Sequence, residues 1–335
     1  MKNKRILLIG GSGYIGTVMS KKLLSKNYEV VNLDNHLFRN SFAIENLKLN
    51  NNYTFIDGDL LNEENLLKSI KNVSDVIILA GIVGDPLSKK YPKTTLKINE
   101  LGIINCLNFL KNKGIDKVIF ISTCSNYGLI KDNEIADEKF SLNPLSVYAK
   151  TKVNIEKYLL DEKNNFDYSS VILRFATAFG LSDRMRFDLT VNQFTHELLL
   201  KKELIVYDPD TWRPYFHTED FAKVVSEILN LDHKNINKEV FNVGTDKNNH
   251  TKRNLVEIIK KYIPNAKIKI QSNGTDRRNY RVNFKKINQL INLKPKTVSE
   301  GIEEIISTFN NGKFKDYENN YQKYGNYEIS YEYKK

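Results

Sequence analysis

Tyr148 and Lys152 are spaced so that they can work as one proton-transfer group. They stand four residues apart in YAKTK (148–152), at the start of a helical pattern, so both side chains lie on one face of a helix. A phenol near its ordinary pKa of about 10 is a poor base at neutral pH, but an adjacent ammonium favours the phenolate and lowers that pKa. The pair is therefore suited to exchanging a proton with a hydroxyl group on a carbon that loses hydride.

A hydroxyl-rich segment precedes this pair in the sequence. The apolar run KVIFIS (117–122), typical of a buried strand, continues into TCSNYG (123–128). A Thr or Ser hydroxyl at the C-terminal end of such a strand can hydrogen-bond the reacting oxygen. A Tyr and a Lys at this spacing also occur by chance, as a half-buried Tyr beside a Lys whose stem covers apolar surface, so the surrounding motifs decide the interpretation.

A glycine-rich turn, GGSGYIG (10–16), follows the first apolar run and opens a helical pattern. Glycines at 10, 13 and 16 allow a tight turn, close approach of the backbone to a pyrophosphate, and close packing of helix on strand. The N-terminus of the helix offers free N–H groups to the anion. The turn therefore predicts a dinucleotide site that includes Gly10, Gly13 and Gly16.

Two acids follow at the ends of the next two expected strands. Asp34 suits the ribose hydroxyls and repels a 2′-phosphate, so it favours NAD over NADP; the alternative is a surface Asp beside a glycine-rich turn. Asp59 can accept a hydrogen bond from the adenine amino group, or it can cap the helix that follows. The other residues expected along the cofactor groove are Tyr14, Ile15, Asn35, Leu60, Leu79, Ala80, Gly81 and Asn99, together with Tyr148 and Lys152.

The elements that position these residues alternate between apolar strands and helices as far as residue 180. This pattern predicts an α/β fold with a Rossmann-like, doubly wound parallel sheet. The expected strands are 5–10, 29–34, 53–57, 75–80, 117–122 and 170–175. The expected helices are 14–26, 63–71, 94–112, 147–161, 188–201, 219–230, 252–262 and 299–309. We expect an NAD-binding domain at 1–180, a smaller, mainly substrate-binding region at 181–315 over the C-terminal edge of the sheet, and a surface arm or poorly ordered tail at 316–335.

Composition excludes several other classes. Lys and Arg outnumber Asp and Glu by 51 to 40, but they are spread along the chain without a basic and aromatic cluster, so we expect no nucleic-acid partner. No apolar run approaches the roughly 20 residues that cross a bilayer, and the first strand begins too early for a signal peptide, so we expect a cytoplasmic protein with no membrane partner. Two cysteines and five scattered histidines predict neither a disulfide framework nor a metal site.

The motifs together resemble the extended short-chain dehydrogenase/reductases, the NAD-dependent nucleotide-sugar epimerase/dehydratase family. The resemblance rests on GGSGYIG, STCSNYG, YAKTK, LRFATAFG, WRPYFHTED and FNVGT and covers the chain to about residue 310. It implies a catalytic set of Thr123, Tyr148 and Lys152 and a tightly held NAD that oxidises a sugar hydroxyl, usually at C4. The 4,6-dehydratases of the family carry Asp and Glu where this chain has Cys124 and Ser125. Neither replaces a carboxylate pair at neutral pH, and Cys124 is interpreted as a packing residue.

The resemblance also implies the contacts to a nucleotide-sugar substrate. Similar segments reach the diphosphate through an Asn and arginines, whose guanidinium forks match phosphate oxygens, although each arginine could equally form a surface salt bridge. The expected substrate contacts are Val83, Asp85, Thr177, Arg184, Arg186, Asn192, Arg213 and Arg278.

Hydride transfer at C4, by a 4-epimerase or a 4-dehydrogenase, is the expected function. The segments GIVGDPL (81–87), RMRFDLTVNQF (184–194) and TDRRNYRV (275–282) most resemble a branch acting on GDP-heptose-type sugars. A 4-keto nucleotide-sugar reductase using NAD(P)H and a non-catalytic NAD-binding sensor on the same fold are the alternatives. The family implies a homodimer through the helices near 94–112 and 147–161, whose apolar positions could also pack inside one subunit.

Overall fold

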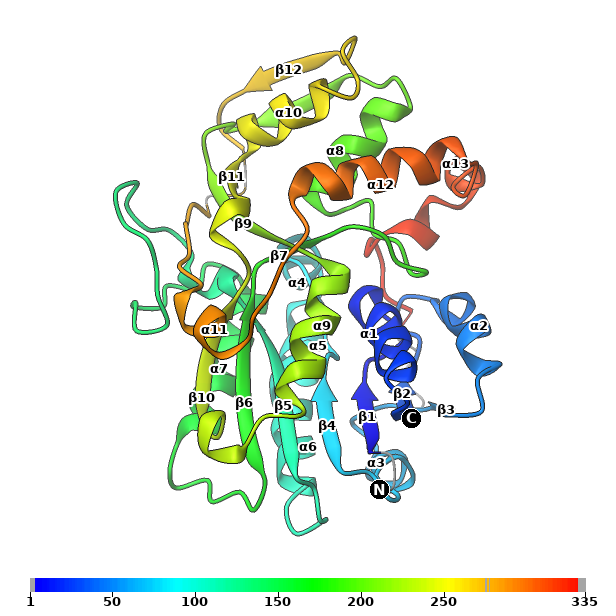
Figure 1. Cartoon of the computed structure of the whole chain (residues 1–335), viewed down its shortest axis with the longest axis vertical. Helices are drawn as coiled ribbons and strands as arrows, with labels where there is room; N and C mark the ends of the chain where they lie inside the picture. The colour runs from blue at the N-terminus through cyan, green and yellow to red at the C-terminus, as the bar shows by residue number, and fades with distance from the viewer. Residues whose placement is uncertain (1–3, 275, 277, 331–335) are drawn as a thin grey trace.

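A seven-stranded parallel sheet forms the lower part of the molecule in Figure 1. The structure is a computed structural model that describes residues 4–274, 276 and 278–330. The sheet order is β10-β6-β5-β4-β1-β2-β3, so the chain passes outward from β1 in one direction and then resumes on the other side of β1. The strands are β1 (Arg5–Ile9), β2 (Glu29–Asp34), β3 (Tyr53–Asp57), β4 (Asp75–Ile78), β5 (Lys117–Thr123), β6 (Ser169–Phe175) and β10 (Glu239–Val243). The predicted Rossmann-like fold is confirmed.

Helices cover both faces of the sheet because its strands are apolar on both sides. Ile6 and Leu8 of β1 belong to one buried cluster and Leu7 and Ile9 to the other, as the alternation of side chains along a strand requires. The first cluster packs under α1 (Tyr14–Ser25), α2 (Glu45–Lys48), α9 (Thr218–Ile228) and α11 (Lys285–Leu290). The second packs under α3 (Glu63–Ser69), α4 (Asp85–Lys90), α6 (Ile103–Phe109) and α7 (Val147–Leu160).

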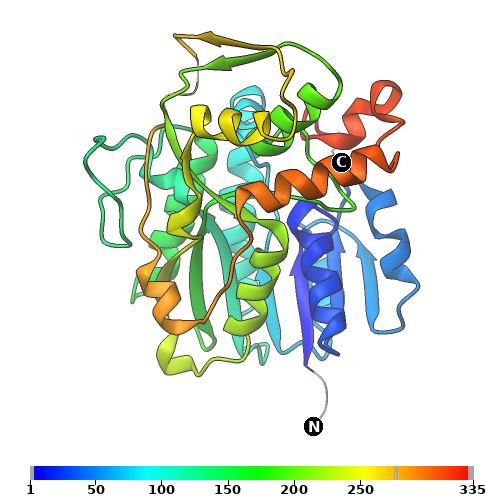
Figure 2. The same ribbon diagram turned by 45° about the horizontal axis from the view of Figure 1, so that its top comes forward.

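The chain from residue 177 onward builds a smaller region over the carboxyl ends of the strands (Figures 1 and 2). It also returns to the sheet, because β10 pairs with β6 and α9 packs against α1. Part of the chain after the boundary expected at residue 180 therefore belongs to the sheet domain. The smaller region contains β7 (Thr177–Phe179), β8 (Leu204–Tyr207), β9 (Trp212–His217), β11 (Asn249–Thr251), β12 (Ile268–Gln271), α8 (Thr190–Leu199), α10 (Lys252–Lys260) and α12 (Val298–Asn310).

Two segments differ from the helices and the tail that the sequence predicted. The helix expected at 94–112 is divided into α5 (Pro92–Leu96), a π-helical turn (Lys97–Gly102) and α6. Residues 316–330 are packed rather than forming a surface arm: α13 (Tyr317–Asn320) and a 3₁₀ turn (Tyr321–Tyr324) lead to a buried Tyr324. Residues 331–335 lie outside the described residues. Other 3₁₀ turns lie at Ser41–Ile44, Cys124–Tyr127, His233–Asn235 and Asp246–Asn248.

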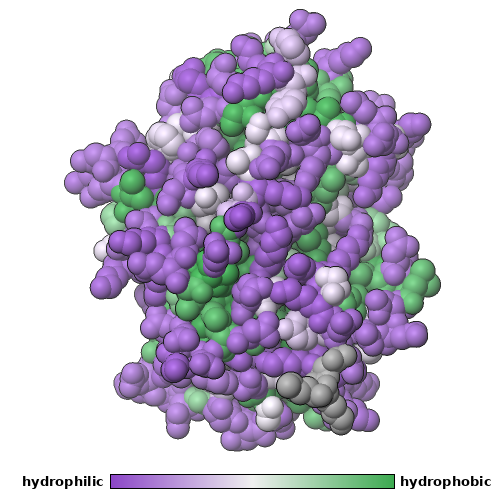
Figure 3. Space-filling model, in the orientation of Figure 1, coloured by the Kyte–Doolittle hydropathy of each residue, from purple (hydrophilic) through white to green (hydrophobic). Residues whose placement is uncertain are grey.

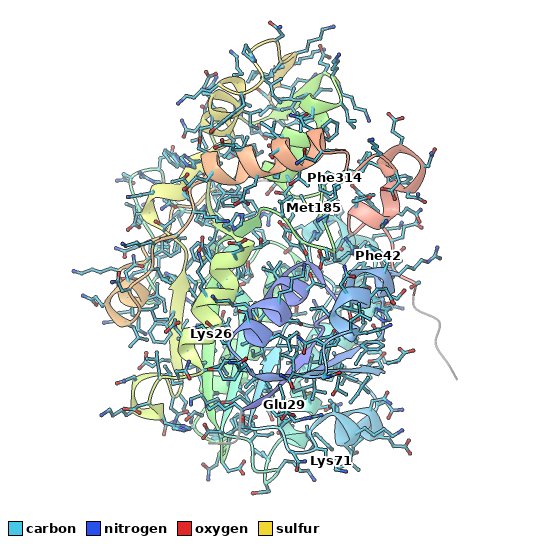
Figure 4. All side chains as sticks on the ribbon, turned by 45° about the vertical axis from the view of Figure 1, so that its right-hand side comes forward. Lys26, Glu29, Phe42, Lys71, Met185 and Phe314 are labelled. Atoms are coloured by element: carbon cyan, nitrogen blue, oxygen red, sulfur yellow. The ribbon has the colours of Figure 1, made fainter. Side chains whose placement is uncertain are left out.

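Apolar side chains hold this C-terminal segment in place. Tyr324 belongs to a buried cluster with Met185, Phe187 and Phe314. Figure 4 shows Met185 and Phe314 near one another, between α12 and the C-terminal turn. The cluster joins the last part of the chain to the segment that follows β7.

The outer surface is mostly polar on the face shown in Figure 3, where apolar side chains form separate patches. Among the described residues, no helix is long and apolar enough to span a bilayer.

Candidate active site

A cavity of about 560 Å³ opens at the carboxyl ends of the strands, and the ends of β1 and β4 lie at its base. The sheet order reverses between these two strands, which is where open α/β folds bind ligands. The predicted residues that line it are Gly10, Gly13, Tyr14, Ile15, Gly16, Asp34, Asn35, Asp59, Leu60, Leu79, Ala80, Gly81, Val83, Asp85, Thr123, Tyr148, Lys152, Thr177, Arg184, Arg186, Arg213 and Arg278. Of the predicted site residues, Asn99 and Asn192 do not line it.

The glycine turn at one side of the cavity leaves no room for side chains at two positions. Gly10 has a φ of +88°, and a Cβ there would lie 2.7 Å from the backbone of Ala80. A Cβ at Gly16 would lie 2.5 Å from the carbonyl oxygen of Gly11. The turn brings the N-terminus of α1 to the cavity wall, where its free N–H groups can meet an anion.

Asp34 and Asp59 both face the cavity from neighbouring strand ends. The Asp34 carboxylate accepts hydrogen bonds from the backbone N–H groups of Ser12, at 2.9 Å, and His36, at 2.8 Å, and burial raises its pKa. Asp59 accepts from the Leu61 N–H at 2.9 Å. The helix-cap alternative for Asp59 is wrong, because Asn62 caps α3. Both acids line the cavity together with the glycine turn.

Asn99 lies behind the cavity wall rather than in it, which corrects the prediction that it contacts the cofactor. It is fully buried on the π-helical turn, accepts from the Ile82 N–H at 2.7 Å and donates to the Ile82 carbonyl at 2.9 Å. The turn aims its amide at the backbone of the loop after β4. Asn99 therefore holds in place the loop that carries Gly81 and Val83 to the cavity.

Tyr148 enters the cavity from the first turn of α7. Ser146 caps that helix by accepting from the Ala149 N–H at 3.1 Å. Burial is the main cause that raises the pKa of Tyr148 to about 12, and the negative charge of Asp85 is the second. A hydrogen bond with Thr123, at the end of β5, acts in the opposite direction. The phenol therefore faces a hydroxyl on one side and a carboxylate nearby.

The Lys152 ammonium is held by the backbone of β5 rather than by the phenol. Its ammonium donates to the Ile121 carbonyl at 2.7 Å and lies 6.0 Å from the centre of the Tyr148 ring. Burial lowers the pKa of Lys152 to about 7. The predicted lowering of the Tyr148 pKa is wrong, because burial outweighs the hydrogen bond with Thr123, which acts in the opposite direction.

A buried ion pair fixes α7 against the strand ends. Glu156 of α7 accepts from Arg174 of β6 at 2.6 Å and from Asn126 at 2.8 Å. Cys124 is also buried, its thiol donates to the Arg174 carbonyl, and burial raises its pKa, so the predicted packing role is confirmed. These contacts set the angle at which Tyr148 and Lys152 reach the cavity.

Two arginines gather on another wall of the cavity, in a network with two acids. Asp276 pairs with Arg213 at 2.9 Å and with Arg278 at 2.8 Å, and Arg278 also pairs with Asp85 at 3.2 Å. Burial alone would raise the pKa of Asp276, but the two guanidinium groups hold it well below its usual range. Neighbouring guanidinium groups in a buried site are suited to binding a diphosphate.

The side chains of Arg186 and Asn192 contact other residues of the protein. Arg186 forms a two-pronged contact with Asp188, at 3.0 and 2.5 Å. Asn192 is fully buried, donates to the Tyr14 hydroxyl and the Arg186 carbonyl, each at 2.9 Å, and accepts from the Gly180 N–H at 3.0 Å. Its predicted role at the substrate diphosphate is therefore replaced by a structural one, because these contacts engage both atoms of its amide.

Comparison with known proteins identifies the family. The family model described as the NAD dependent epimerase/dehydratase family matches residues 6–244. The chain belongs to this family. It is an NAD-dependent enzyme of the epimerase/dehydratase type, so the predicted family, enzyme class and cofactor are confirmed.

Relatives of this epimerase/dehydratase cover nearly its whole length. An uncharacterised protein of Methanocaldococcus jannaschii is 30% identical over 92% of this chain and 97% of its own. A putative UDP-glucose 4-epimerase of the same organism is 29% identical over 91% and 98%. The crystal structure of UDP-glucuronic acid 4-epimerase from Bacillus cereus, in complex with UDP-glucuronic acid and NAD, is 26% identical with a TM-score of 0.81 and covers 90% of this chain and 99% of its own.

Several residues of the epimerase/dehydratase cavity were missed in the sequence. Ser125 lines it and contacts Tyr280 and Arg278, although its motif indicated only a missing carboxylate. Asp276 stands two residues before Arg278, a spacing that could have predicted their ion pair. The other missed side chains include Phe38, Lys252, Asn326 and Tyr327. Asn326 and Tyr327 lie in an aperiodic stretch that carries no sequence signal for a site.

Proposed function

We propose that this enzyme is a 4-epimerase, which removes hydride from C4 of a nucleotide sugar and returns it to the opposite face. One arrangement carries the proposal: Tyr148 and Thr123 line the same cavity as the glycine turn and the arginine pair Arg213 and Arg278. A sugar between a nicotinamide and a diphosphate held by the arginines would have its ring beside the phenol. The function of the B. cereus relative, a 4-epimerase of a nucleotide sugar, supports the same reaction.

Three side chains have separate roles in the proposed proton transfer. NAD supplies the hydride acceptor when bound. Tyr148 takes the proton from the C4 hydroxyl, and Thr123 hydrogen-bonds the same oxygen and keeps it aimed at the phenol. Lys152, within the same cavity, favours the phenolate whenever it carries its charge.

Elimination of water is not part of this proposal. A 4,6-dehydratase needs an acid and a base beside C5 and C6 of the sugar. Cys124 is buried with a raised pKa, and Ser125 is a neutral hydroxyl that contacts Tyr280. These two positions support epimerisation or simple oxidation over dehydration.

The proposed substrate contacts are the two arginines at the diphosphate and Val83, Asp85 and Thr177 at the sugar, joined by Ser125. The free oxygen of Asp85 suits a sugar hydroxyl, because its Oδ1 is buried and has no hydrogen-bond partner among the described residues. Motif similarity supports GDP-heptose-type sugars, while the relatives named above support UDP-sugars. The test therefore includes both UDP-sugars and GDP-sugars.

We further propose a homodimer through α5, the π-helical turn and α7. Leu96 and Leu101 on the first two of these segments expose 45% and 58% of their surface, which supports a covered face in the assembly. A monomeric mass in light scattering at micromolar concentration would contradict it.

The enzymatic proposal is tested by incubating the protein and NAD in deuterated water with UDP-glucose, UDP-glucuronic acid, UDP-N-acetylglucosamine, GDP-mannose and a GDP-heptose. Nuclear magnetic resonance would show the C4 epimer, without deuterium on the sugar, for at least one substrate. Accumulation of NADH and a 4-keto sugar would favour the 4-dehydrogenase alternative, and activity only on 4-keto sugars with NAD(P)H would favour the reductase. A dehydrated product with deuterium at C5 would contradict the proposal.

A further inference from the structure

Arg184 carries a buried charge without a carboxylate partner among the described residues. The residue is 1% exposed, and its guanidinium donates to the Met185 and Gly325 carbonyls and to Oδ1 of Asn326, at 3.0, 2.9 and 3.0 Å. Its Nε is buried and makes no hydrogen bond in the described part of the chain. Burial lowers its pKa to about 10. A buried cation with an unused donor is costly unless an anion joins it.

The surroundings of Arg184 belong to the cofactor side of the cavity. Its guanidinium lies 5.8 Å from the centre of the Phe38 ring, which follows β2 and Asp34. Its backbone N–H donates to Ser182, whose hydroxyl donates to the carbonyl of Tyr14, the first residue of α1. Arg213 and Arg278, in contrast, both contact Asp276, and Arg278 also contacts Asp85 and Ser125. Arg184 therefore lies near the helix N-terminus that receives a dinucleotide diphosphate.

The C-terminal strap, which we define as residues 324–330, closes the same side of the cavity. It begins at buried Tyr324, whose carbonyl accepts from the Phe187 N–H at 2.7 Å, and ends at Ser330, whose N–H donates to the Leu37 carbonyl at 2.8 Å. Between these anchors, Glu328 pairs with Lys90 of α4 at 3.4 Å. Asn326 and Tyr327 line the cavity. Figure 1 shows this segment, in red, descending from α13 toward α1.

We propose that the C-terminal strap is a wall of the cofactor site and that Arg184, which holds the strap, binds the diphosphate of NAD rather than that of the substrate. The diphosphate then completes the hydrogen bonding of the guanidinium and supplies its counter-ion. Release of NAD requires the strap to lift, because the cofactor lies between the strap and the glycine turn. The strap thereby slows exchange of the cofactor.

The contact with the diphosphate is tested with Arg184→Gln, a neutral side chain that keeps two hydrogen-bond groups. Calorimetry should show about 10- to 100-fold weaker binding of NAD and ADP-ribose and unchanged binding of adenosine, which lacks phosphate. Arg253→Gln is the matched control, because Arg253 is exposed and pairs with Asp210 away from the cavity. Equal losses for adenosine and NAD, or no loss for either, would overturn the assignment.

The strap is tested without touching the arginine. Ser330→Pro removes the N–H that donates to the Leu37 carbonyl, while Ser330→Ala keeps this N–H and loses only the hydroxyl, which donates to the same carbonyl at 3.1 Å. The dissociation rate of NADH, followed by its fluorescence, should rise several-fold in the proline variant and by less in the alanine variant. Equal rates in all three proteins would refute closure by the strap. Both tests measure cofactor binding alone, so they remain informative even if no nucleotide sugar is turned over.

Discussion

The ammonium of Lys152 lies 6.0 Å from the centre of the Tyr148 ring and donates to the Ile121 carbonyl instead. The two residues thus share a helix face without a direct hydrogen bond between them. With burial raising the pKa of Tyr148 to about 12, the phenol is protonated at neutral pH. Activation of the phenol therefore requires a positive charge or a hydrogen-bond donor beside it.

The first prediction concerns the proton carrier. Tyr148→Phe removes only the hydroxyl, so binding of NAD should stay within about twofold, while turnover should fall by about 10²- to 10⁴-fold, the range for loss of a general acid–base group. Calorimetry and a product assay would measure the two effects. Tyr321→Phe, at a residue 50% exposed, is the control. Unchanged turnover in the Tyr148 variant would contradict the role of this phenol in proton transfer.

The second prediction concerns the charge that opposes the phenolate. Burial is the main cause of the raised pKa of Tyr148, and the charge of Asp85 is the second. Asp85→Asn should therefore lower that pKa. Since the phenolate is the active base, the acidic limb of the kcat profile should move to lower pH, by up to about one unit. Asp210→Asn, at an exposed ion pair, should leave the profile in place. A shift toward higher pH would contradict this account of the site.

Much of the fold could be predicted because its signals are local. Apolar runs bounded by turns indicated β1 to β6, since strands buried on both faces must be apolar throughout. The strand β10 was missed because it joins the sheet only by pairing with β6, far back in the sequence. The π-helical turn at 97–102 was also missed, since it changes hydrogen-bond spacing without changing the apolar pattern.

The site was predictable where one motif carries a whole contact, as in the glycine turn and YAKTK. It was not predictable where partners come from distant segments. The sequence predicted that Asn192 contacts the substrate. In the structure its amide instead donates to the Tyr14 hydroxyl and to the Arg186 carbonyl. Arg184 and Arg186 look equivalent in the sequence, yet Arg186 pairs with Asp188 and Arg184 faces the C-terminal strap.

The third prediction concerns the acid that occupies the arginine pair. In the proposed complex, a substrate diphosphate would displace Asp276 from Arg213 and Arg278, because the same donors hold its carboxylate. Asp276→Asn should therefore bind UDP or GDP several-fold more tightly, as calorimetry would show. Asp232→Asn, at an exposed residue paired with Lys234, should bind like wild type. Weaker binding in the Asp276 variant would mean that this carboxylate contacts the nucleotide directly.

The fourth prediction follows from the buried ammonium. Burial moves the pKa of Lys152 from 10.5 to about 7, so between these values the folded protein binds fewer protons than the unfolded chain. The cost of burying the charge is then full below about pH 7 and disappears as the pH rises toward 10.5.

Lys152→Met should accordingly be inactive and yet more stable than wild type near neutral pH, by up to about 5 kcal/mol, which corresponds to a pKa shift from 10.5 to about 7. Urea unfolding at about pH 6.5 and about pH 9 would measure the gain, which should shrink at the higher pH because wild type has lost its charge there. Lys150→Met, at an exposed position of the same helix, should show no such pH dependence. A gain that grows with pH would show that the ammonium is stabilised by its surroundings, and the physical account of the Tyr148 and Lys152 pair would then be wrong.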